Sequence, residues 1–219
     1  MTVRHDGITA EWLGYATLRL EANGTVVYLD PGRYGVLTGE WEYEPDHGGH
    51  PPSRGYAPHD GDIVCVSHIH PYHPDGIRRV ARDDATVVAF EGINVHATDR
   101  EIDRLVDLDY DLRRVSMESE CLVDGVPIWT TAAYNRQDGP NLNDDGEPIH
   151  PKGIGCGFLV ALDETRVFWP GDSDVLPGHA ELDVSLSVPS IAQKYTMDRH
   201  DAADLAAEID PDLVVPIHY

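Results

Sequence analysis

Apolar and polar residues alternate near the start of the chain, which is the pattern of strands with one buried face. Asn23-Gly24 interrupts the alternation, and both residues tolerate positive φ, so the pair predicts a tight hairpin turn. We therefore expect a meander that ends at Asp30-Pro31-Gly32. Its three strands are predicted over 8–13, 16–21 and 25–30.

The remaining pattern mixes further strands with helices. Apolar or alternating runs predict strands over 63–66, 86–90, 121–123, 126–133, 156–162, 166–169, 184–188 and 213–217. Helical spacing predicts helices over 77–82, 98–108 and 198–209, the last of them amphipathic. The segments 33–61 and 135–155 lack periodicity and are predicted to be long loops. This mixture favours an α/β or α+β sandwich.

Length and composition narrow the class of protein. With 219 residues and no linker or repeat, we expect a single domain over 1–219. No apolar run approaches the roughly 20 residues that a bilayer requires, and the N-terminus lacks a signal-peptide core. The sequence therefore predicts a cytoplasmic protein without a membrane partner.

The charge is strongly negative, with 39 acidic and 16 basic residues and a formal net charge of −23. Lys152 and Lys194 are the only lysines. A scattered acidic excess suits a surface that stays hydrated in high salt, so we interpret the chain as a halophile's protein, with an acidic mesophilic protein as the alternative. Binding to nucleic acid is not expected, because that affinity comes from clustered Lys and Arg.

The densest candidate chemistry follows the strand over 63–66. The segment Ser67 to Gly76 carries His68, His70 and His73, and neutral imidazole is a common metal ligand. Pro71 and Pro74 oppose helix continuation and predict a turn that can aim several imidazoles at one point. A solvated polar loop is the alternative interpretation of this segment.

Further ligand-type residues also follow predicted strands. His68, Asp172 and His218 each stand just beyond the carboxyl end of a strand. Folds of the α/β class place their chemistry at such ends. The sequence therefore predicts that these side chains belong to one site.

Taken together, the motifs resemble the metallo-β-lactamase superfamily, nearest to its small metal-dependent hydrolases similar to L-ascorbate-6-phosphate lactonase. The resemblance rests on segments in the family's order along nearly the whole chain. They are 12–17, 29–31, 67–76, 131–135, 168–173, 196–198 and 215–219. It implies a four-layer αββα sandwich with a metal site at one edge of its two sheets.

The resemblance also implies a ligand set for one or two divalent ions. His68, His70 and Asp172 match ligands of the first ion, and His73, His218 and the shared Asp172 match those of the second. Two positions depart from the family pattern: Tyr72 stands at its aspartate and Asn135 at its third histidine. Each ion would then keep three strong protein ligands, which suffices for catalytic zinc.

Three interpretations of function follow from this set. The first is a hydrolase of a small ester, lactone or phosphoester, in which metal-bound hydroxide lies beside Asp172 and Tyr72 stabilises an oxyanion or protonates the leaving group. The second is a catalytically degenerate relative that binds a metabolite or partner, motivated by Tyr72 and Asn135. The third is an RNA nuclease of the same superfamily, which is disfavoured because this chain lacks the basic surface that such an enzyme requires.

Two further residues are weaker candidates. His150 lies on the loop after Asn135, where it replaces the missing imidazole or is a surface histidine. Lys194 precedes the last helix, where it pairs with an anionic substrate group or is simply solvated. Zinc is the favoured metal, with manganese or iron as alternatives. The particular substrate and the oligomeric state have no signal in the sequence.

Overall fold

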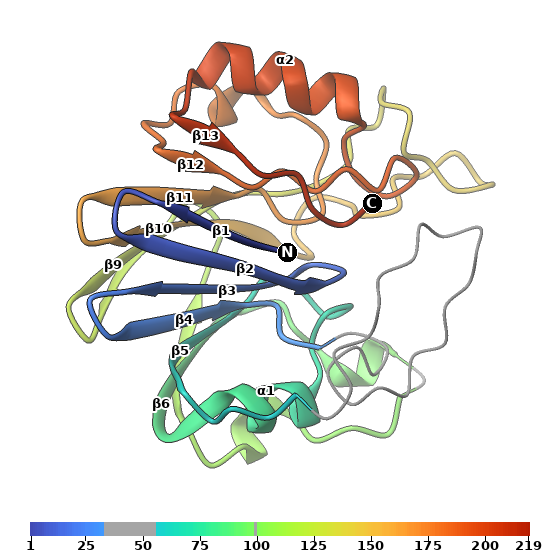
Figure 1. Cartoon of the computed structure of the whole chain (residues 1–219). Helices are drawn as coiled ribbons and strands as arrows, with labels where there is room; N and C mark the ends of the chain where they lie inside the picture. Colours follow the sequence, from blue (N-terminus) through green and yellow to red (C-terminus); the bar gives the residue numbers. More distant parts are fainter. Residues whose placement is uncertain (33–55, 99) are drawn as a thin grey trace. The chain divides into compact units, whose positions relative to one another are not determined.

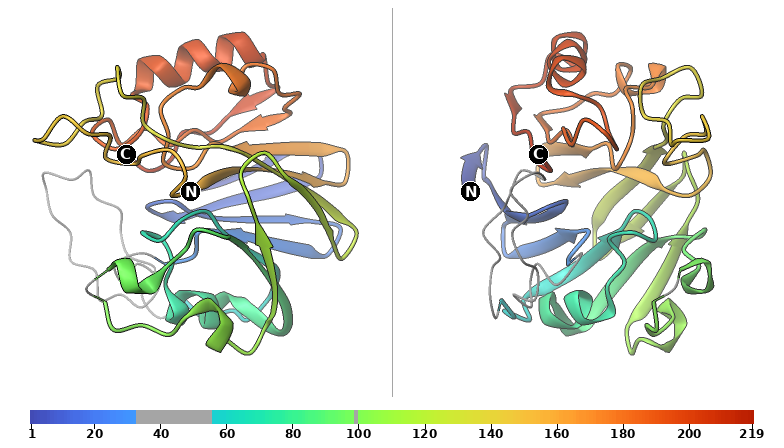
Figure 2. Two further views of the ribbon diagram at one scale, coloured as in Figure 1. Left: turned by 180° about the vertical axis from the view of Figure 1, so that it is seen from behind. Right: turned by 90° about the vertical axis from the view of Figure 1, so that its right-hand side faces the viewer.

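The computed structural model describes residues 1–32, 56–98 and 100–219, which form two compact units, Met1–Val115 and Ser116–Tyr219. Each unit is built on one β-sheet (Figures 1 and 2). Most of the predicted loop over 33–61, including His47 and His50, lies outside the described residues. The prediction of a single domain stays a prediction.

The first unit contains a seven-stranded sheet whose spatial order follows the chain. Its first four strands are antiparallel, whereas β4–β5, β5–β6 and β6–β7 are parallel pairs. The strands are β1 (Thr2–His5), β2 (Ile8–Gly14), β3 (Thr17–Ala22), β4 (Thr25–Leu29), β5 (Gly61–Val66), β6 (Ala81–Phe90) and β7 (Asp111–Val115). The predicted meander is thereby confirmed. The strands β1 and β7 were not predicted from the sequence pattern.

The hairpin between β3 and β4 turns where the sequence predicts it. Asn23 has φ +50° and Gly24 has φ +83°, the positive values that a two-residue hairpin of type I′ requires. The register then pairs Leu20 with Val27, both of which are fully buried. The turn thus fixes which face of the meander enters the core.

Helix α1 (Pro74–Val80) begins directly after His73, the last histidine of the segment. Pro74 occupies the first helical turn, where its missing N–H costs nothing. Gly76 is required for close approach rather than for unusual backbone angles, because a Cβ there would lie 2.3 Å from the Pro31 carbonyl oxygen. This contact seats α1 against the end of the meander.

The predicted helix over 98–108 is wrong. In the described part of this segment, the only helical element is the short 3₁₀ turn η3 (Leu105–Asp107). A second 3₁₀ turn, η2 (Val95–Ala97), precedes the segment. The Asp103 carbonyl oxygen accepts a hydrogen bond from the Tyr72 hydroxyl, and the Arg100 guanidinium donates to the carbonyls of Ile69 and Tyr72. Tertiary contacts therefore override the helical spacing, which is only a weak preference.

The second unit contains a six-stranded sheet in the order β13-β12-β11-β10-β9-β8. The strands β8 to β11 are antiparallel, and β11–β12 and β12–β13 are parallel. The strands are β8 (Glu120–Val123), β9 (Val126–Ala132), β10 (Cys156–Leu162), β11 (Thr165–Trp169), β12 (Leu186–Ser187) and β13 (Leu213–Val214). Every predicted strand here is confirmed, although β12 and β13 are shorter than expected.

Helix α2 (Arg199–Ile209) covers a core of this unit and confirms the predicted amphipathic helix. The Asp198 carboxylate caps it by accepting hydrogen bonds from the backbone N–H groups of His200 and Asp201. Ala202 and Leu205 pack into a buried cluster with Phe168 of β11. Burial of this stripe is what holds so short a helix in place.

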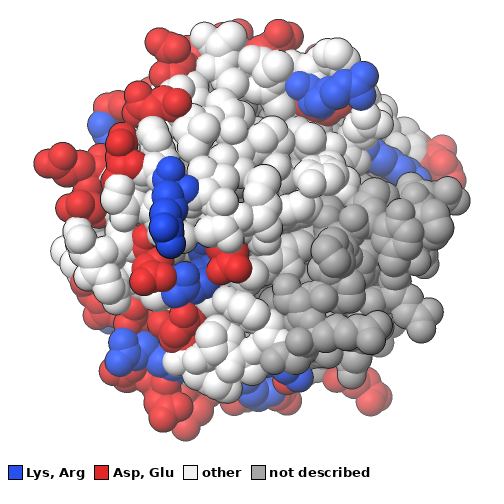
Figure 3. Space-filling model, in the orientation of Figure 1, with Lys and Arg blue, Asp and Glu red and all other residues white. Residues whose placement is uncertain are grey.

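Most charged residues of both units lie at the surface, where the arginines are largely paired with carboxylates. Figure 3 shows Asp and Glu gathered along the left side and the rim of the face drawn, with Lys and Arg among them. Most described arginines form ion pairs within their own unit, such as Arg79 with Asp75 at 2.7 Å and Arg104 with Asp107 at 2.7 Å. Among the described residues, no helix has the length and apolar character needed to cross a bilayer.

One buried histidine couples stability to pH. His179 in the 3₁₀ turn η4 (Pro177–His179) donates from Nε2 to the Ala132 carbonyl oxygen at 2.9 Å. Burial lowers the pKa of His179 below its ordinary value, against the opposing effect of that hydrogen bond. The folded state therefore keeps His179 neutral when the unfolded chain has already bound a proton.

The free energy of unfolding should consequently fall as the pH drops below about 6.5, and His179→Gln should make this fall shallower. Chemical denaturation between about pH 7 and pH 5 at constant salt measures the slope. His96→Gln is the matched control, because His96 is exposed and should leave the slope unchanged. Equal slopes for wild type and His179→Gln would contradict the assignment.

Candidate metal centre

In the first unit, the candidate ligands emerge where two neighbouring parallel strands end. Asp30 follows β4, and Ser67 and His68 follow β5, which pairs with β4 from Val27–Ile63 to Leu29–Cys65. Parallel strands place their carboxyl ends at the same edge of a sheet. The prediction that His68 stands just past a strand end is confirmed.

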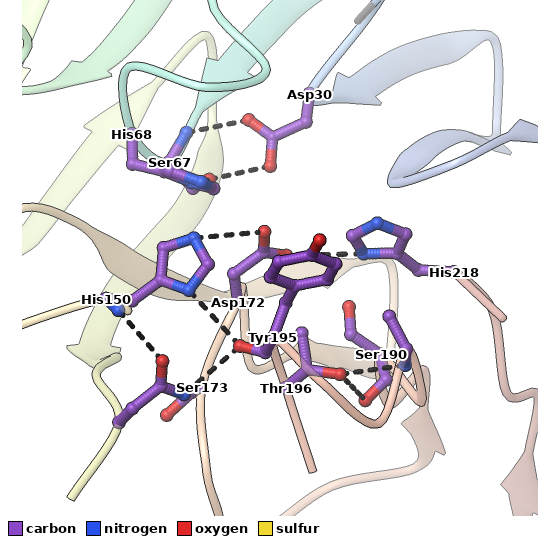
Figure 4. A network of polar contacts seen from close by, with 12 residues as sticks. Asp30, Ser67, His68, His150, Asp172, Ser173, Ser190, Tyr195, Thr196 and His218 are labelled. Atoms are coloured by element: carbon purple, nitrogen blue, oxygen red, sulfur yellow. Dashed lines mark hydrogen bonds and ion pairs between the residues drawn. The ribbon is translucent and has the colours of Figure 1, made fainter. Parts of the chain in front are cut away.

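A short relay of hydrogen bonds fixes the His68 ring (Figure 4). The Asp30 carboxylate accepts from the Ser67 N–H at 2.8 Å and from the Ser67 hydroxyl at 2.7 Å. The Ser67 hydroxyl oxygen lies 2.8 Å from His68 Nδ1. Because the hydroxyl hydrogen is directed to Asp30, Nδ1 carries the proton that completes this contact, and neutral His68 keeps its lone pair on Nε2.

His70 and the turn around it are held by a residue that the sequence analysis missed. The rings of His68 and His70 meet edge to face with centroids 5.0 Å apart. The Arg100 guanidinium donates to the Ile69 carbonyl at 2.6 Å and to the Tyr72 carbonyl at 3.1 Å. It therefore braces the backbone on both sides of His70. No local sequence pattern predicts this contact, because Arg100 is distant in sequence from the carbonyls that it binds.

His73 has a structural contact of its own. It is the N-cap of α1, and its Nδ1 lies 3.2 Å from the Gly76 N–H, from which it accepts. A neutral imidazole that accepts at Nδ1 carries its proton on Nε2. A ligand role for His73 would require either that Nδ1 leaves the Gly76 N–H or that Nε2 loses its proton, and this role stays a prediction.

Tyr72 is fully buried, and its hydroxyl donates to the Asp103 carbonyl oxygen at 2.7 Å. Burial raises the pKa of Tyr72 to about 12, with the Asp103 carboxylate adding to the rise. The phenol is thus held protonated and engaged by the backbone. These contacts support a packing role, and the predicted catalytic role of Tyr72 finds no support in them.

In the second unit, two predicted histidines lie beside one predicted carboxylate. Asp172 follows β11, His218 follows β13, and His150 comes from the loop before β10. The Asp172 Oδ1 lies 3.3 Å from His218 Nδ1, and its Oδ2 lies 3.6 Å from His150 Nε2 (Figure 4). All three side chains are buried. Asp172 thus presents one oxygen to each imidazole.

The tautomer of His150 is fixed by its other nitrogen. Its Nδ1 lies 3.2 Å from the Tyr195 carbonyl oxygen, which can only accept, so Nδ1 carries the proton. Neutral His150 therefore turns the Nε2 lone pair toward the Asp172 carboxylate. Two such acceptors are stable side by side when a cation or a proton lies between them.

The spacing of these donor atoms fits a divalent ion. Ligands at about 2.0–2.1 Å from a tetrahedral zinc ion lie roughly 3.3–3.5 Å from one another. The two gaps around Asp172 measure 3.3 Å and 3.6 Å, longer than the hydrogen bonds nearby. Imidazole nitrogens and carboxylate oxygens suit zinc, manganese and iron alike. His150, Asp172 and His218 therefore fit the metal that the sequence predicts.

Asn135, predicted as a weak metal ligand, is a structural hub instead of an open donor. Its amide nitrogen donates to Asp174 at 3.0 Å and to the Tyr195 carbonyl at 3.1 Å, while its amide oxygen accepts from the His150 N–H at 2.8 Å. Its own N–H donates to the His150 carbonyl at 2.7 Å. Asn135 thus positions His150, and its ligand role stays a prediction without support from these contacts.

Asp174 was missed by the sequence analysis, although it stands two residues after Asp172. It is buried, and its carboxylate accepts from the amides of Asn135 and Asn141 and from the Arg136 N–H at 2.8 Å. These contacts fasten the loop before β10 to the end of β11. The polar spacing alone does not reveal a clamp made by side-chain amides.

Comparisons with known proteins identify the fold and the family. The fold is the mixed α/β metallo-β-lactamase fold, with two sheets and few helices, which confirms the predicted class. The chain belongs to the metallo-β-lactamase superfamily, because the family model described as "Beta-lactamase superfamily domain" matches residues 9–218.

Individual relatives are distant but cover most of the chain. A UPF0173 metal-dependent hydrolase of Methanopyrus kandleri is 26% identical over 216 residues, which are 95% of this chain and 82% of that protein. A solved structure from Parabacteroides distasonis has a TM-score of 0.70 at 21% identity, covering 97% of this chain and 82% of the other. Igni18, a metallo hydrolase from Ignicoccus hospitalis, gives 0.62 at 18% identity, with the same coverage of 97% and 82%.

The capping contact of His73 can be tested apart from metal binding. His73→Ala should lower the free energy of unfolding by about 1 kcal/mol, because the Gly76 N–H loses its partner, and His73→Asn should recover most of it. Chemical denaturation after treatment with a chelator measures both variants. The assignment fails if Asn is no more stable than Ala at this position.

Proposed function

We propose that this protein is a metal-dependent hydrolase of a small ester, lactone or phosphoester. The observation that carries the proposal is the buried Asp172 carboxylate with one imidazole nitrogen 3.3 Å and another 3.6 Å from its oxygens. Carboxylates and neutral histidines are the common ligands of catalytic metal sites. The names of the relatives, metal-dependent hydrolase and metallo hydrolase, support the same reaction class.

We further propose that the ligands come from both halves of the chain. His68 and His70 are the proposed ligands of the first unit, and His150, His218 and the shared Asp172 are those of the second unit. The support is the order of the motifs in one family model spanning residues 9–218 and the lone pair that the Asp30–Ser67 relay leaves on His68 Nε2. Zinc is the first candidate.

His150 replaces the imidazole that Asn135 does not supply. The sequence left this role open, and the burial of His150 and its distance to Asp172 now favour it over a surface position. Asn135 becomes the residue that orients the replacement, through the hydrogen bonds to the backbone of His150. The departure at Asn135 is therefore compensated within the same unit.

The chemistry divides between the metal and the protein. A bound divalent ion lowers the pKa of water and polarises the bond to be cleaved. Asp172 would help to orient the attacking water, because its buried carboxylate lies beside both imidazoles. The Tyr195 carbonyl holds the proton on His150 Nδ1, so that Nε2 stays a donor to the metal.

A catalytically degenerate relative that binds a metabolite or a partner is the second candidate. It is favoured by Tyr72 and His73, whose polar atoms are engaged by the Asp103 carbonyl and by the Gly76 N–H. If those contacts persist, the second ion loses two of the ligands expected from the family. Lactone hydrolysis similar to that of L-ascorbate-6-phosphate lactonase is one form of the first candidate, and turnover decides between the two.

Asp172→Ala should remove bound metal and turnover together, because both proposed ions share this carboxylate. Elemental mass spectrometry gives metal per chain, and a panel of ester, lactone and phosphodiester substrates gives turnover. Asp183→Ala is the matched control, since that carboxylate pairs with Arg166 at the surface of the same unit. Full activity of Asp172→Ala would overturn the proposed mechanism.

The role of His150 has its own test. His150→Ala should weaken zinc binding by about tenfold or more, the usual size of a lost ligand or its support, whereas exposed His200→Ala should not. Competition with a chromogenic chelator measures the affinity. Circular dichroism of both variants separates lost ligation from lost folding. Equal affinities in a folded His150→Ala protein would show that His150 is not a ligand.

A further inference from the structure

The only lysines of the chain, Lys152 and Lys194, lie in the second unit and differ from the arginines in their surroundings. Arginines of both units pair with carboxylates, as Arg136 does with Asp138 and Arg166 with Asp183. Within the described part of the chain, neither lysine forms such an ion pair. The ammonium groups are therefore not neutralised by ion pairs with the acidic residues of the surface.

Each lysine instead lies over a tyrosine ring. The Lys152 Nζ is 5.5 Å from the centroid of the Tyr134 ring, and the Lys194 Nζ is 5.7 Å from that of the Tyr195 ring. Both distances are within the range of a cation–π contact. Such a contact positions an ammonium group without neutralising its charge, so its N–H donors stay available to an anion.

Both lysine–tyrosine pairs are fastened to the candidate metal centre by their backbones. The Tyr134 carbonyl accepts from the hydroxyl of Ser173, the residue after Asp172, at 3.1 Å. The Tyr195 carbonyl accepts from His150 Nδ1 at 3.2 Å. Lys152 is two residues beyond His150, and Lys194 directly precedes Tyr195. Both lysines therefore belong to short segments whose backbone contacts reach His150 or the residue after Asp172.

We propose that Lys152 and Lys194 bind the anionic group of the substrate, so that the hydrolase acts on small esters bearing a carboxylate or a phosphate. A chain with a net charge of −23 repels anions, and an anionic substrate therefore needs a local positive field at the site. Lysine suits this task because its ammonium is a compact point charge on a flexible stem. The inference rests on the proposed function and deepens it.

Binding tests the lysines without turnover. Inorganic phosphate and succinate are titrated calorimetrically into the zinc-loaded protein, at the lowest potassium chloride concentration that keeps it folded. Lys152→Met/Lys194→Met should weaken the tighter anion by about fivefold to tenfold, as expected for two lost exposed charge contacts. The anion that binds more tightly identifies the group, phosphate or carboxylate, that the lysines recognise.

The matched control is Arg113→Gln/Arg166→Gln, which removes the same charge from exposed arginines paired with Asp111 and Asp183. It should change the affinity less than twofold. Equal weakening in both double variants would assign the effect to overall charge and overturn the proposal. Unchanged affinity in the lysine variant would overturn it as well.

Turnover provides a second readout. The ratio of kcat/KM for 4-nitrophenyl hydrogen succinate to that for 4-nitrophenyl acetate should fall about tenfold in the lysine double variant and stay constant in the arginine control. A constant ratio in both would contradict the substrate class. If wild type cleaves neither ester yet binds anions through the lysines, the hydrolase proposal fails while the anion site stands.

Discussion

The second unit depends on one buried carboxylate. Asp172 is removed from water and faces His150 at 3.6 Å and His218 at 3.3 Å. An uncompensated charge at this depth would cost several kcal/mol, so the surrounding structure has to supply a positive partner. A divalent ion meets this requirement and at the same time makes the group reactive. Stability and chemistry therefore place the same demand on this point of the fold.

Within each unit, a hydrogen bond to the far side of a candidate imidazole ligand fixes its tautomer. The Tyr195 carbonyl directs the lone pair of His150, and the Ser67 hydroxyl, itself held by Asp30, directs that of His68. Backing contacts of this kind fix the tautomer and raise the basicity of a ligand. Asn135 then ties the His150 backbone in place, so a residue that departs from the family motif still serves the site.

Strand positions were predictable because alternation and turn chemistry are local, as Asn23-Gly24 shows. The strand-end positions of His68, Asp172 and His218 followed from the same logic. What the sequence could not predict are contacts between distant segments. Where a helix was expected, the chain is irregular and its Asp103 carbonyl accepts a hydrogen bond from Tyr72. The Asn135 amide, expected at a metal, instead donates to Asp174 and to the Tyr195 carbonyl. The role proposed for His150 rests on its burial and its partners, neither of which the sequence pattern predicts.

An anomalous-difference map recorded at the zinc absorption edge, from crystals grown with zinc, tests the central claim most directly. The account predicts a peak within bonding distance of an Asp172 carboxylate oxygen and of His150 Nε2. A map without a peak at Asp172, or with zinc bound only to exposed residues, would contradict it.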